Sequence, residues 1–574
     1  MPNIFLITAG IIVVFTFLFF PVTDNDIWWH LAYGKLMIED GNFPRADVFS
    51  YTAYGKSVYL DSWIFDAASY LGFKFLGGIE AINLLKAGVA LAIFVLVLWY
   101  LRAEKTLNLF SLGFVILAFF SIRYGFSLRP QIFSFFFFIV LFILLAQFFK
   151  SGEKKYLFFI FIAQFAWVNF HISFLYGIGL AAIFILSDLW RMKKIRREHI
   201  TLVGTVLGAS LLHAFYWQNY IIGALQRSSM AVQSVVTEFQ PTTPDRLLSP
   251  IGLVILALIP VIYFSWKQKK YEILLIAVSA TILSMRSGRF IPYLVLFLCL
   301  ALPVCWKSVK LRPKFKFVLP KYFSVGAYLA FLFIIFIYTK NYGPGINPGV
   351  PKSSYPVDAV RFIQQLKDLP QKSGGRIFNS YNFGGYLIWN LHPQYKVFLD
   401  GRYTPYAGEI FDKYWESVEG GKAWKNTVKK YDITLALMPL PYSDGKTIYN
   451  NSSAMFPEAE WAPIYYDDVS IIYAKKTDEL QDVIGKYGYK VLNPQELDLS
   501  YIQSKIKSRE DFDMALREIQ RGLEVNPDSY RLHFTAAYLY GFADDENQMK
   551  TELRKVLEIN PNFGPARQLL GPSL

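Results

Sequence analysis

Long apolar runs, separated by short polar segments, dominate the first 340 residues of the chain. Runs of about 16–20 apolar residues are long enough to cross a bilayer as helices. We expect about eleven membrane-spanning helices, at residues 4–22, 81–101, 107–122, 131–149, 156–170, 173–190, 200–217, 250–266, 271–285, 290–306 and 322–339. The pattern therefore predicts a polytopic α-helical membrane domain over residues 1–340.

The pattern changes after residue 340. Residues 341–355 are rich in turn formers and indicate a linker. From 356 to 478, strand-type runs such as RIFN and ITLALMP alternate with helical ones, which predicts an α/β domain. In residues 479–574, Pro527 and Pro561 stand one tetratricopeptide period apart, so we expect a helical tetratricopeptide-like segment. That segment either packs on the α/β domain or binds a protein partner.

The net charge of +14 is concentrated in five short connections, at 102–105, 150–155, 191–197, 267–270 and 307–321. They are alternate loops, which is the bias of the cytoplasmic face of membrane proteins. We therefore expect a multi-pass protein of the cytoplasmic (inner) membrane with its N-terminus inside and the domains after residue 340 outside. Membrane topology therefore explains the excess of basic residues, and we expect the lipid bilayer, not nucleic acid, as a partner.

The first outer loop, residues 23–80, is long for a connection and opens with TDNDIWWHLAYG. Two stretches in it have apolar residues at helical spacing and predict helices that lie along the membrane surface. Asp26 and Asp61 each stand at or beside the start of one of these helices. A plain N-cap is the alternative explanation for both, although Asp24 can already cap the first helix.

Four arginines lie at outer helix edges, where basic residues are disfavoured: Arg123 and Arg129 in SIRYGFSLRPQ, and Arg286 and Arg289 in SMRSGRFIPY. Guanidinium groups suit phosphate, but they also reach for lipid headgroups or pair with acids. Other outer edges carry Asn169, His171 and Glu238. A histidine at a helix end is more often a packing residue than a catalyst. For Glu238, a structural role and a functional role are both open.

These motifs together resemble the GT-C superfamily of membrane glycosyltransferases, which includes protein O-mannosyltransferases and the aminoarabinose transferases for lipid A. Asp26 takes the place of the family's catalytic carboxylate, while Ile27 and His30 differ from its usual Glu and Tyr. The chain is similar still more closely to a set of bacterial membrane proteins that share five motifs, here at Asp24–His30, Gly41–Thr52, Ser127–Gln131, Val168–His171 and Phe378–Arg402.

The resemblance implies transfer of a sugar from a polyprenyl-phosphate carrier to an acceptor on the outer face. Asp26 is then the expected general base, with Asp24 and Asp61 beside it. The expected ligands of the donor phosphate are Arg129, Arg289, Arg123 and Arg286. The residues expected to orient the substrates are His30, Asn169, His171 and Glu238. The sequence assigns no certain cofactor, but Asp24 or Glu238 can offer oxygen ligands to a divalent cation, Mg²⁺ or Mn²⁺.

Two other functions compete with this interpretation. The chain can be a non-catalytic scaffold subunit that binds envelope proteins through its C-terminal tail. It can also be a transporter of lipid-linked sugars, but transporters place ionisable residues near the bilayer midplane, and the centres of the expected spans are almost free of charge. We therefore favour the enzyme over the scaffold, and both over the transporter.

Overall fold

The computed structural model describes residues 2, 4–215, 218, 240–243, 249–307, 321–342, 349–440, 452–493 and 499–571. The chain divides into two compact units. The first comprises Met1–Pro44 and Tyr59–Val350, and the second comprises Arg45–Val58 and Pro351–Leu574. The first outer loop is therefore shared, because its middle segment belongs to the second unit.

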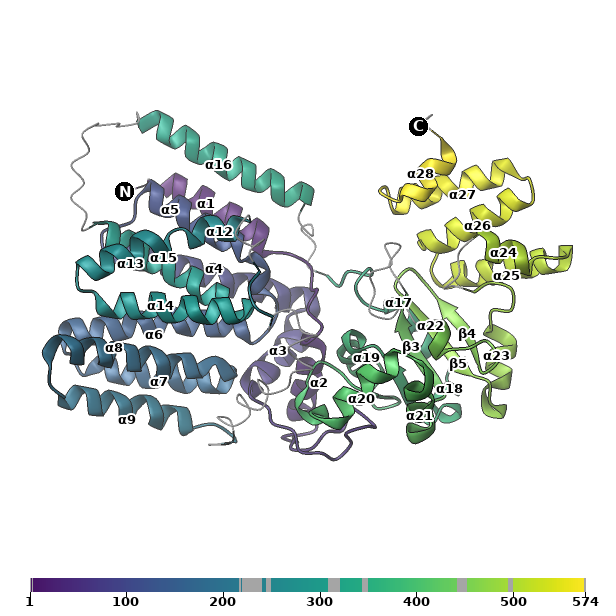
Figure 1. Cartoon of the computed structure of the whole chain (residues 1–574), viewed down its shortest axis with the longest axis horizontal. Helices are drawn as coiled ribbons and strands as arrows, with labels where there is room; N and C mark the ends of the chain where they lie inside the picture. Colours follow the sequence, from purple (N-terminus) through teal and green to yellow (C-terminus); the bar gives the residue numbers. More distant parts are fainter. Residues whose placement is uncertain are drawn as a thin grey trace. The chain divides into compact units, whose positions relative to one another are not determined.

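The first unit is a helical bundle (Figure 1). A helix occupies each of the eleven expected ranges: α1 (Ile4–Leu18), α4 (Ile79–Ala103), α5 (Leu109–Ser121), α6 (Gln131–Ser151), α7 (Lys155–Phe170), α8 (Leu175–Met192), α9 (Arg197–Leu211), the pair α12 (Pro250–Ile255) and α13 (Leu258–Lys267), α14 (Tyr271–Arg286), α15 (Ile291–Lys307) and α16 (Lys321–Tyr342). Within the described residues, five helical stretches are long and apolar enough to cross a membrane, and four shorter ones are also apolar. The chain is a helical membrane protein, while the count of eleven crossings stays a prediction.

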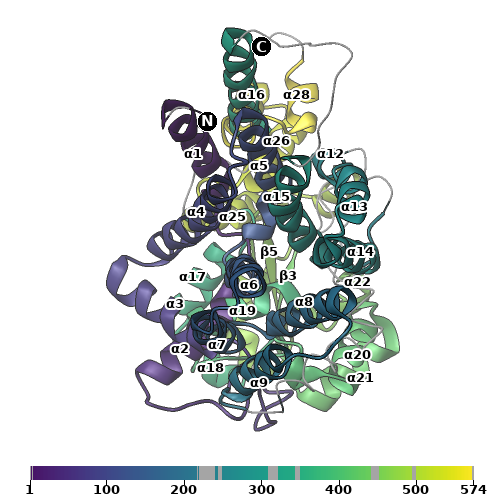
Figure 2. The ribbon, with the colours of Figure 1, turned by 90° about the vertical axis from the view of Figure 1, so that its left-hand side faces the viewer.

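Helix α15 lies at the centre of this bundle, as the end-on view of the helices shows (Figure 2). Its sequence is apolar all round, and nearly all of its side chains are buried against α4, α5, α6, α13 and α14. A helix without a polar face is stable only where it is covered on every side. Cys299 and Cys305 are both free and buried in α15.

Two helices of the first outer loop pack side by side, α2 (Ile27–Ile38) and α3 (Trp63–Leu76). They approach closely because Gly34 has no side chain. A Cβ built at Gly34 would lie 2.2 Å from the carbonyl oxygen of Asp66, far inside van der Waals contact. This close approach brings the polar residues of the two helices together.

The second unit contains a five-stranded sheet in the order β2–β1–β3–β5–β4. Its strands are β1 (Arg376–Asn379), β2 (Lys396–Val397), β3 (Leu435–Pro439), β4 (Trp461–Tyr466) and β5 (Ser470–Lys475). Strands β2, β1 and β3 are parallel, whereas β5 is antiparallel to both of its neighbours. The helices around it are α17 (Val357–Gln365), α18 (Leu369–Lys372), α19 (Gly384–Leu391), α20 (Glu409–Val418), α21 (Gly421–Tyr431), α22 (Ser452–Met455) and α23 (Gln481–Tyr487).

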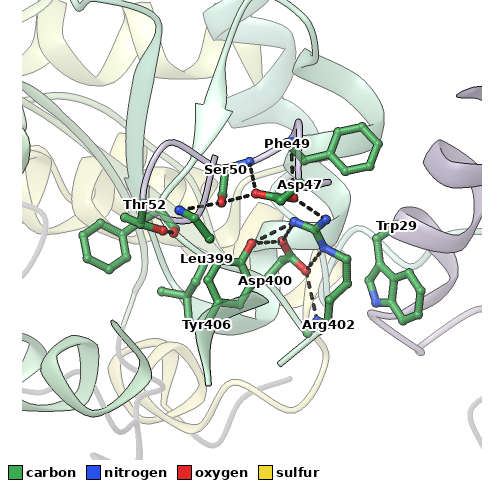
Figure 3. Close-up of polar contacts among 12 residues, drawn as sticks. Trp29, Asp47, Phe49, Ser50, Thr52, Leu399, Asp400, Arg402 and Tyr406 are labelled. Atoms are coloured by element: carbon green, nitrogen blue, oxygen red, sulfur yellow. Dashed lines mark hydrogen bonds and ion pairs between the residues drawn. The ribbon is translucent and has the colours of Figure 1, made fainter. Parts of the chain in front are cut away.

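The loop segment 45–58 joins the edge of this sheet, where Ser50 bridges Val397 in parallel. A buried network fastens it (Figure 3). Arg402 donates from Nη1 to Asp47 Oδ1 at 2.6 Å and from Nε to Asp400 Oδ1 at 2.7 Å. Arg402 thus pairs with Asp400, from its own chain segment, and with Asp47, an acid from the first outer loop.

The C-terminal helices are α24 (Leu499–Lys505), α25 (Arg509–Val525), α26 (Tyr530–Phe542), α27 (Glu546–Ile559) and α28 (Gly564–Leu570). From α25 onward each helix packs on the next. Two carboxylates attach them to the α/β part: Glu518 accepts the N–H of Lys490 at 2.6 Å, and Asp468 accepts that of Tyr530 at 3.1 Å. The tetratricopeptide assignment and the bounds of the four segments, 1–340, 341–355, 356–478 and 479–574, stay predictions.

Candidate functional site

Asp26 occupies the N-cap position of α2, but its side chain caps no backbone N–H. Instead, Asp26 Oδ1 accepts a hydrogen bond from Trp29 Nε1 at 3.3 Å, and Oδ2 lies 3.5 Å from Arg129 Nε. The N-cap explanation therefore does not apply to the carboxylate of Asp26. Asp24 holds the turn, because its Oδ1 accepts the backbone N–H of Asp26 at 3.0 Å.

Arg129 lies between the short helix η1 (Arg123–Phe126) and α6, far from the first loop in sequence. Its guanidinium forms a close ion pair with Asp24 as well as the longer contact with Asp26. The side chain of Asp24 is only 4% exposed, whereas Asp26 and Arg129 are each 27% exposed. Asp24 is thus neutralised in a buried ion pair, whereas Asp26 and Arg129 remain accessible to solvent.

His30 and Asp61 belong to the same cluster as Asp24, Asp26 and Arg129, which we call the acidic cluster. Burial raises the pKa of Asp26, against the opposing effect of Arg129. Burial likewise raises the pKa of Asp61 to about 6 and lowers the pKa of His30 to about 4, although the nearby Asp26 acts in the other direction on His30. Two carboxylates with raised pKa values beside a neutral imidazole form a group suited to accepting protons near neutral pH.

Two buried residues of this region were not singled out in the sequence. Asp66 of α3 contacts His30, with 2.5 Å between Oδ1 and Nδ1, and burial raises its pKa well above the usual range. Lys86 of α4 is buried with Nζ 3.6 Å from the ring centre of Phe20. Both residues could have been found from the sequence pattern, because Asp66 lies on the apolar helix face of Trp63 and Lys86 interrupts an apolar run.

Asn169 and His171 lie at the end of α7 and serve packing in the structure. Asn169 accepts a hydrogen bond from Trp63 Nε1 at 2.8 Å and donates to two backbone carbonyls at 2.9 Å. His171 Nδ1 lies 2.9 Å from Ser134 Oγ, which also accepts the indole N–H of Trp167 at 3.0 Å. These bonds hold α3, α6 and α7 together beside the acidic cluster.

The other three arginines are placed differently from one another. Arg289, in the short helix η5 (Gly288–Phe290), lines a cavity of ≈ 340 Å³ together with Ser127, Gln131 and mostly apolar neighbours. Its charge also reaches Asp61, where it opposes the rise of that pKa. Arg123 instead lies 4.5 Å from the ring centre of Phe120, and Arg286 is exposed at the end of α14. Glu238 lies outside the described residues.

The described residues include no group of three or more Asp, Glu, His or Cys side chains arranged to hold a metal ion. Asp24, the described candidate for oxygen ligation, is already neutralised by Arg129. Glu238, the other candidate ligand, lies outside the described residues, so the expected divalent cation stays a prediction.

No protein-family model and no curated protein match the chain. It is similar to solved structures of the oligosaccharyltransferase of Archaeoglobus fulgidus. For the apo form the TM-score is 0.52 at 11% identity, over 82% of this chain and 74% of that one. For AglB in complex with an inhibitory peptide and a dolichol-phosphate it is 0.52 at 10% identity, over 94% and 86%.

The chain has the fold of an archaeal oligosaccharyltransferase. A weaker likeness, with a TM-score of 0.44 at 12% identity over 83% of this chain and 40% of that one, links it to the mycobacterial arabinofuranosyltransferase AftD. These likenesses concern the fold alone, and membership of the GT-C superfamily stays a prediction. The subfamily, the roles of the site residues and the tetratricopeptide segment stay predictions.

Proposed function

We propose that this protein is a membrane glycosyltransferase. It moves a sugar from a polyprenyl-phosphate donor to an acceptor on the extracytoplasmic face of the inner membrane. The fold likeness to AglB, which was solved with a dolichol-phosphate, supports a lipid-linked donor. The observation that carries the proposal is the accessible Asp26–Arg129 pair at the start of α2, with Asp24 buried behind it.

Asp26 is the general base of the proposed reaction. The acceptor atom forms a bond to the anomeric carbon while the bond from that carbon to the phosphate oxygen breaks, and the electron pair leaves with the phosphate. The acceptor's proton passes to Asp26. A carboxyl whose pKa is raised by burial is a stronger base than an ordinary aspartate, which suits this step. Direct displacement with one base inverts the sugar carbon.

Arg289 and Arg129 supply the positive charge for the departing phosphate, where negative charge develops in the transition state. The largely apolar cavity that Arg289 lines suits the first part of a polyprenyl chain. Arg123 is committed to aromatic neighbours and Arg286 is exposed, so neither is part of this proposal.

The test uses the full-length protein in lipid nanodiscs with a panel of polyprenyl-phosphate hexoses and pentoses. Sugar consumption is expected for at least one donor, and Asp26→Asn should abolish it without changing abundance or melting temperature. Asp40→Asn is the matched control, because Asp40 is exposed at the end of the same helix. Undiminished transfer by Asp26→Asn would refute the proposed base. If no donor is consumed and only binding of envelope proteins depends on the C-terminal helices, the scaffold function is favoured.

A further inference from the structure

His30 of α2 and Asp66 of α3 form a close, buried polar contact. His30 Nδ1 and Asp66 Oδ1 are 2.5 Å apart, and the two side chains are 3% and 0% exposed. Trp29 stacks on the imidazole with 3.5 Å between ring centres, and Phe65 meets its edge at 5.0 Å. The ring is therefore held in one orientation, and Nδ1 is committed to Asp66.

A nitrogen and an oxygen at this distance must have a hydrogen between them. There are two ways to supply it. Either the imidazole carries it on Nδ1 and donates to an ionised Asp66, or Asp66 is protonated and donates to a bare Nδ1. The position of this hydrogen also decides whether the other ring nitrogen, Nε2, carries one, because a neutral imidazole holds a single N–H hydrogen. In the first case Nε2 is an acceptor, and in the second Nε2 is a donor.

The surroundings of Asp66 favour the protonated carboxyl. Its Oδ2 is buried and has no hydrogen-bond partner among the described residues, and its other oxygen accepts only a long bond of 3.4 Å from Ser62 besides the His30 contact. An ionised carboxylate buried with so few donors is costly, whereas a neutral acid is not.

The charges around the pair favour the same choice. The charges of Asp26, Asp61 and Asp24 raise the pKa of His30 and that of Arg129 lowers it, while His171 lies near enough for His30 to act on it. A further negative charge at Asp66 would add to three carboxylates that Arg129 and Arg289 only partly offset. Burial also lowers the pKa of His30 to about 4, so the imidazole is neutral at neutral pH.

We propose that Asp66 is a positioning residue that stays protonated at neutral pH, donates its hydrogen to Nδ1 of His30, and so fixes Nε2 of the neutral imidazole as a hydrogen-bond donor to the catalytic carboxylates. This assignment rests on the proposed transferase function. It explains why an acid occupies the apolar face of α3. An Nε2–H donor in this acidic cluster can donate a hydrogen bond to an ionised carboxylate and so stabilise its charged form.

Asparagine at position 66 separates the two tautomers, because its amide donates a hydrogen as a protonated acid does and cannot replace a carboxylate acceptor. Asp66→Asn should therefore keep sugar transfer within about tenfold of the native rate, whereas Asp66→Ala should lose about 100-fold. If Asp66 instead acts as an ionised acceptor, Asp66→Asn selects the wrong tautomer and loses about 10⁴-fold. That loss, at unchanged melting temperature, would overturn the inference.

A spectroscopic experiment on the full-length protein in nanodiscs decides the point without any substrate. Infrared spectra at pH 7 should show a protonated-carboxyl band that disappears in Asp66→Asn. ¹⁵N spectra of histidine-labelled protein, with the signal assigned by His30→Gln, should place the hydrogen on Nε2 in both the native protein and Asp66→Asn. A hydrogen on Nδ1 in the native protein would refute the inference. If no donor is ever consumed, the proposed function fails while these spectra still decide the state of the pair.

Discussion

At the scale of single residues, the site depends on two aspartates two positions apart with different environments. Asp24 is buried against Arg129 and fixes the turn before α2, whereas Asp26 is more exposed and has only a long contact with the same guanidinium. Burial raises the pKa of Asp26, and the negative charge of Asp24 raises it further. One aspartate thus tunes the proton affinity of the other.

The first prediction is a pH profile. A base must be deprotonated to act, so transfer is present above the pKa of Asp26 and is lost as the pH falls through it. Because that pKa is raised, the acid limb of kcat/KM should lie above the range of an ordinary aspartate, about 3.9. Asp24→Asn should move the limb to lower pH, since it removes a nearby negative charge and frees Arg129 for Asp26. The control Asp40→Asn should leave the acid limb in place. An acid limb that does not move in Asp24→Asn would contradict the coupling between Asp24 and Asp26.

The sequence could supply Asp24, Asp26, His30 and Arg129 as candidates, because each stands in a compact polar motif beside an apolar run. It could not supply Asp66, whose role depends on how α2 and α3 pack rather than on local spacing. Nor could it separate Arg289, which lines a cavity, from Arg123, which stacks on aromatic rings. Side chains at equivalent helix edges differ in direction, and only three-dimensional packing decides that direction.

At the scale of the elements, apolar run length predicted the helices of the bundle because nothing but a helix satisfies backbone polar groups in a bilayer. The single expected helix at 250–266 is divided between α12 and α13. Pro260 explains the division. It lacks the N–H that would bond to the carbonyl of Leu256 and its ring clashes with that carbonyl, so a new helix begins shortly before it.

The second prediction concerns the contact between α2 and α3. Gly34→Val should force the helices apart, because even a Cβ there overlaps the backbone of Asp66. We expect a loss of about 1–3 kcal/mol in unfolding free energy, together with loss of the protonated-carboxyl band of Asp66. Gly113→Ala in α5 is the control, since a Cβ there meets nothing within 4 Å. Thermal unfolding in detergent measures the stability of both variants. A Gly34→Val protein as stable as the Gly113→Ala control would contradict the close packing of α2 and α3.

At the scale of the whole molecule, the first outer loop links two units through its own chain. Residues before 45 and after 58 belong to the bundle, and the segment between them pairs with the sheet edge at Val397. Arg402 holds this segment by bonding Asp47 and Asp400 at once, and Tyr406 bonds to Arg402 at 2.8 Å. The helices α2 and α3 flank this segment in sequence.

The third prediction tests that attachment. Arg402→Met leaves two buried carboxylates without their cation, and breaking a buried pair in this way costs about 3–5 kcal/mol. Arg402→Lys should recover only part of this stability, because an ammonium cannot match the planar fork that serves both acids. Lys413→Met, which removes an exposed pair with Glu409, should change little. Since the loosened segment contains exposed Arg45 and Lys56, trypsin should cleave Arg402→Met there faster than the Lys413→Met control. Equal cleavage rates with equal stability would show that the segment is held by the backbone pairing at Val397 rather than by the ion pairs.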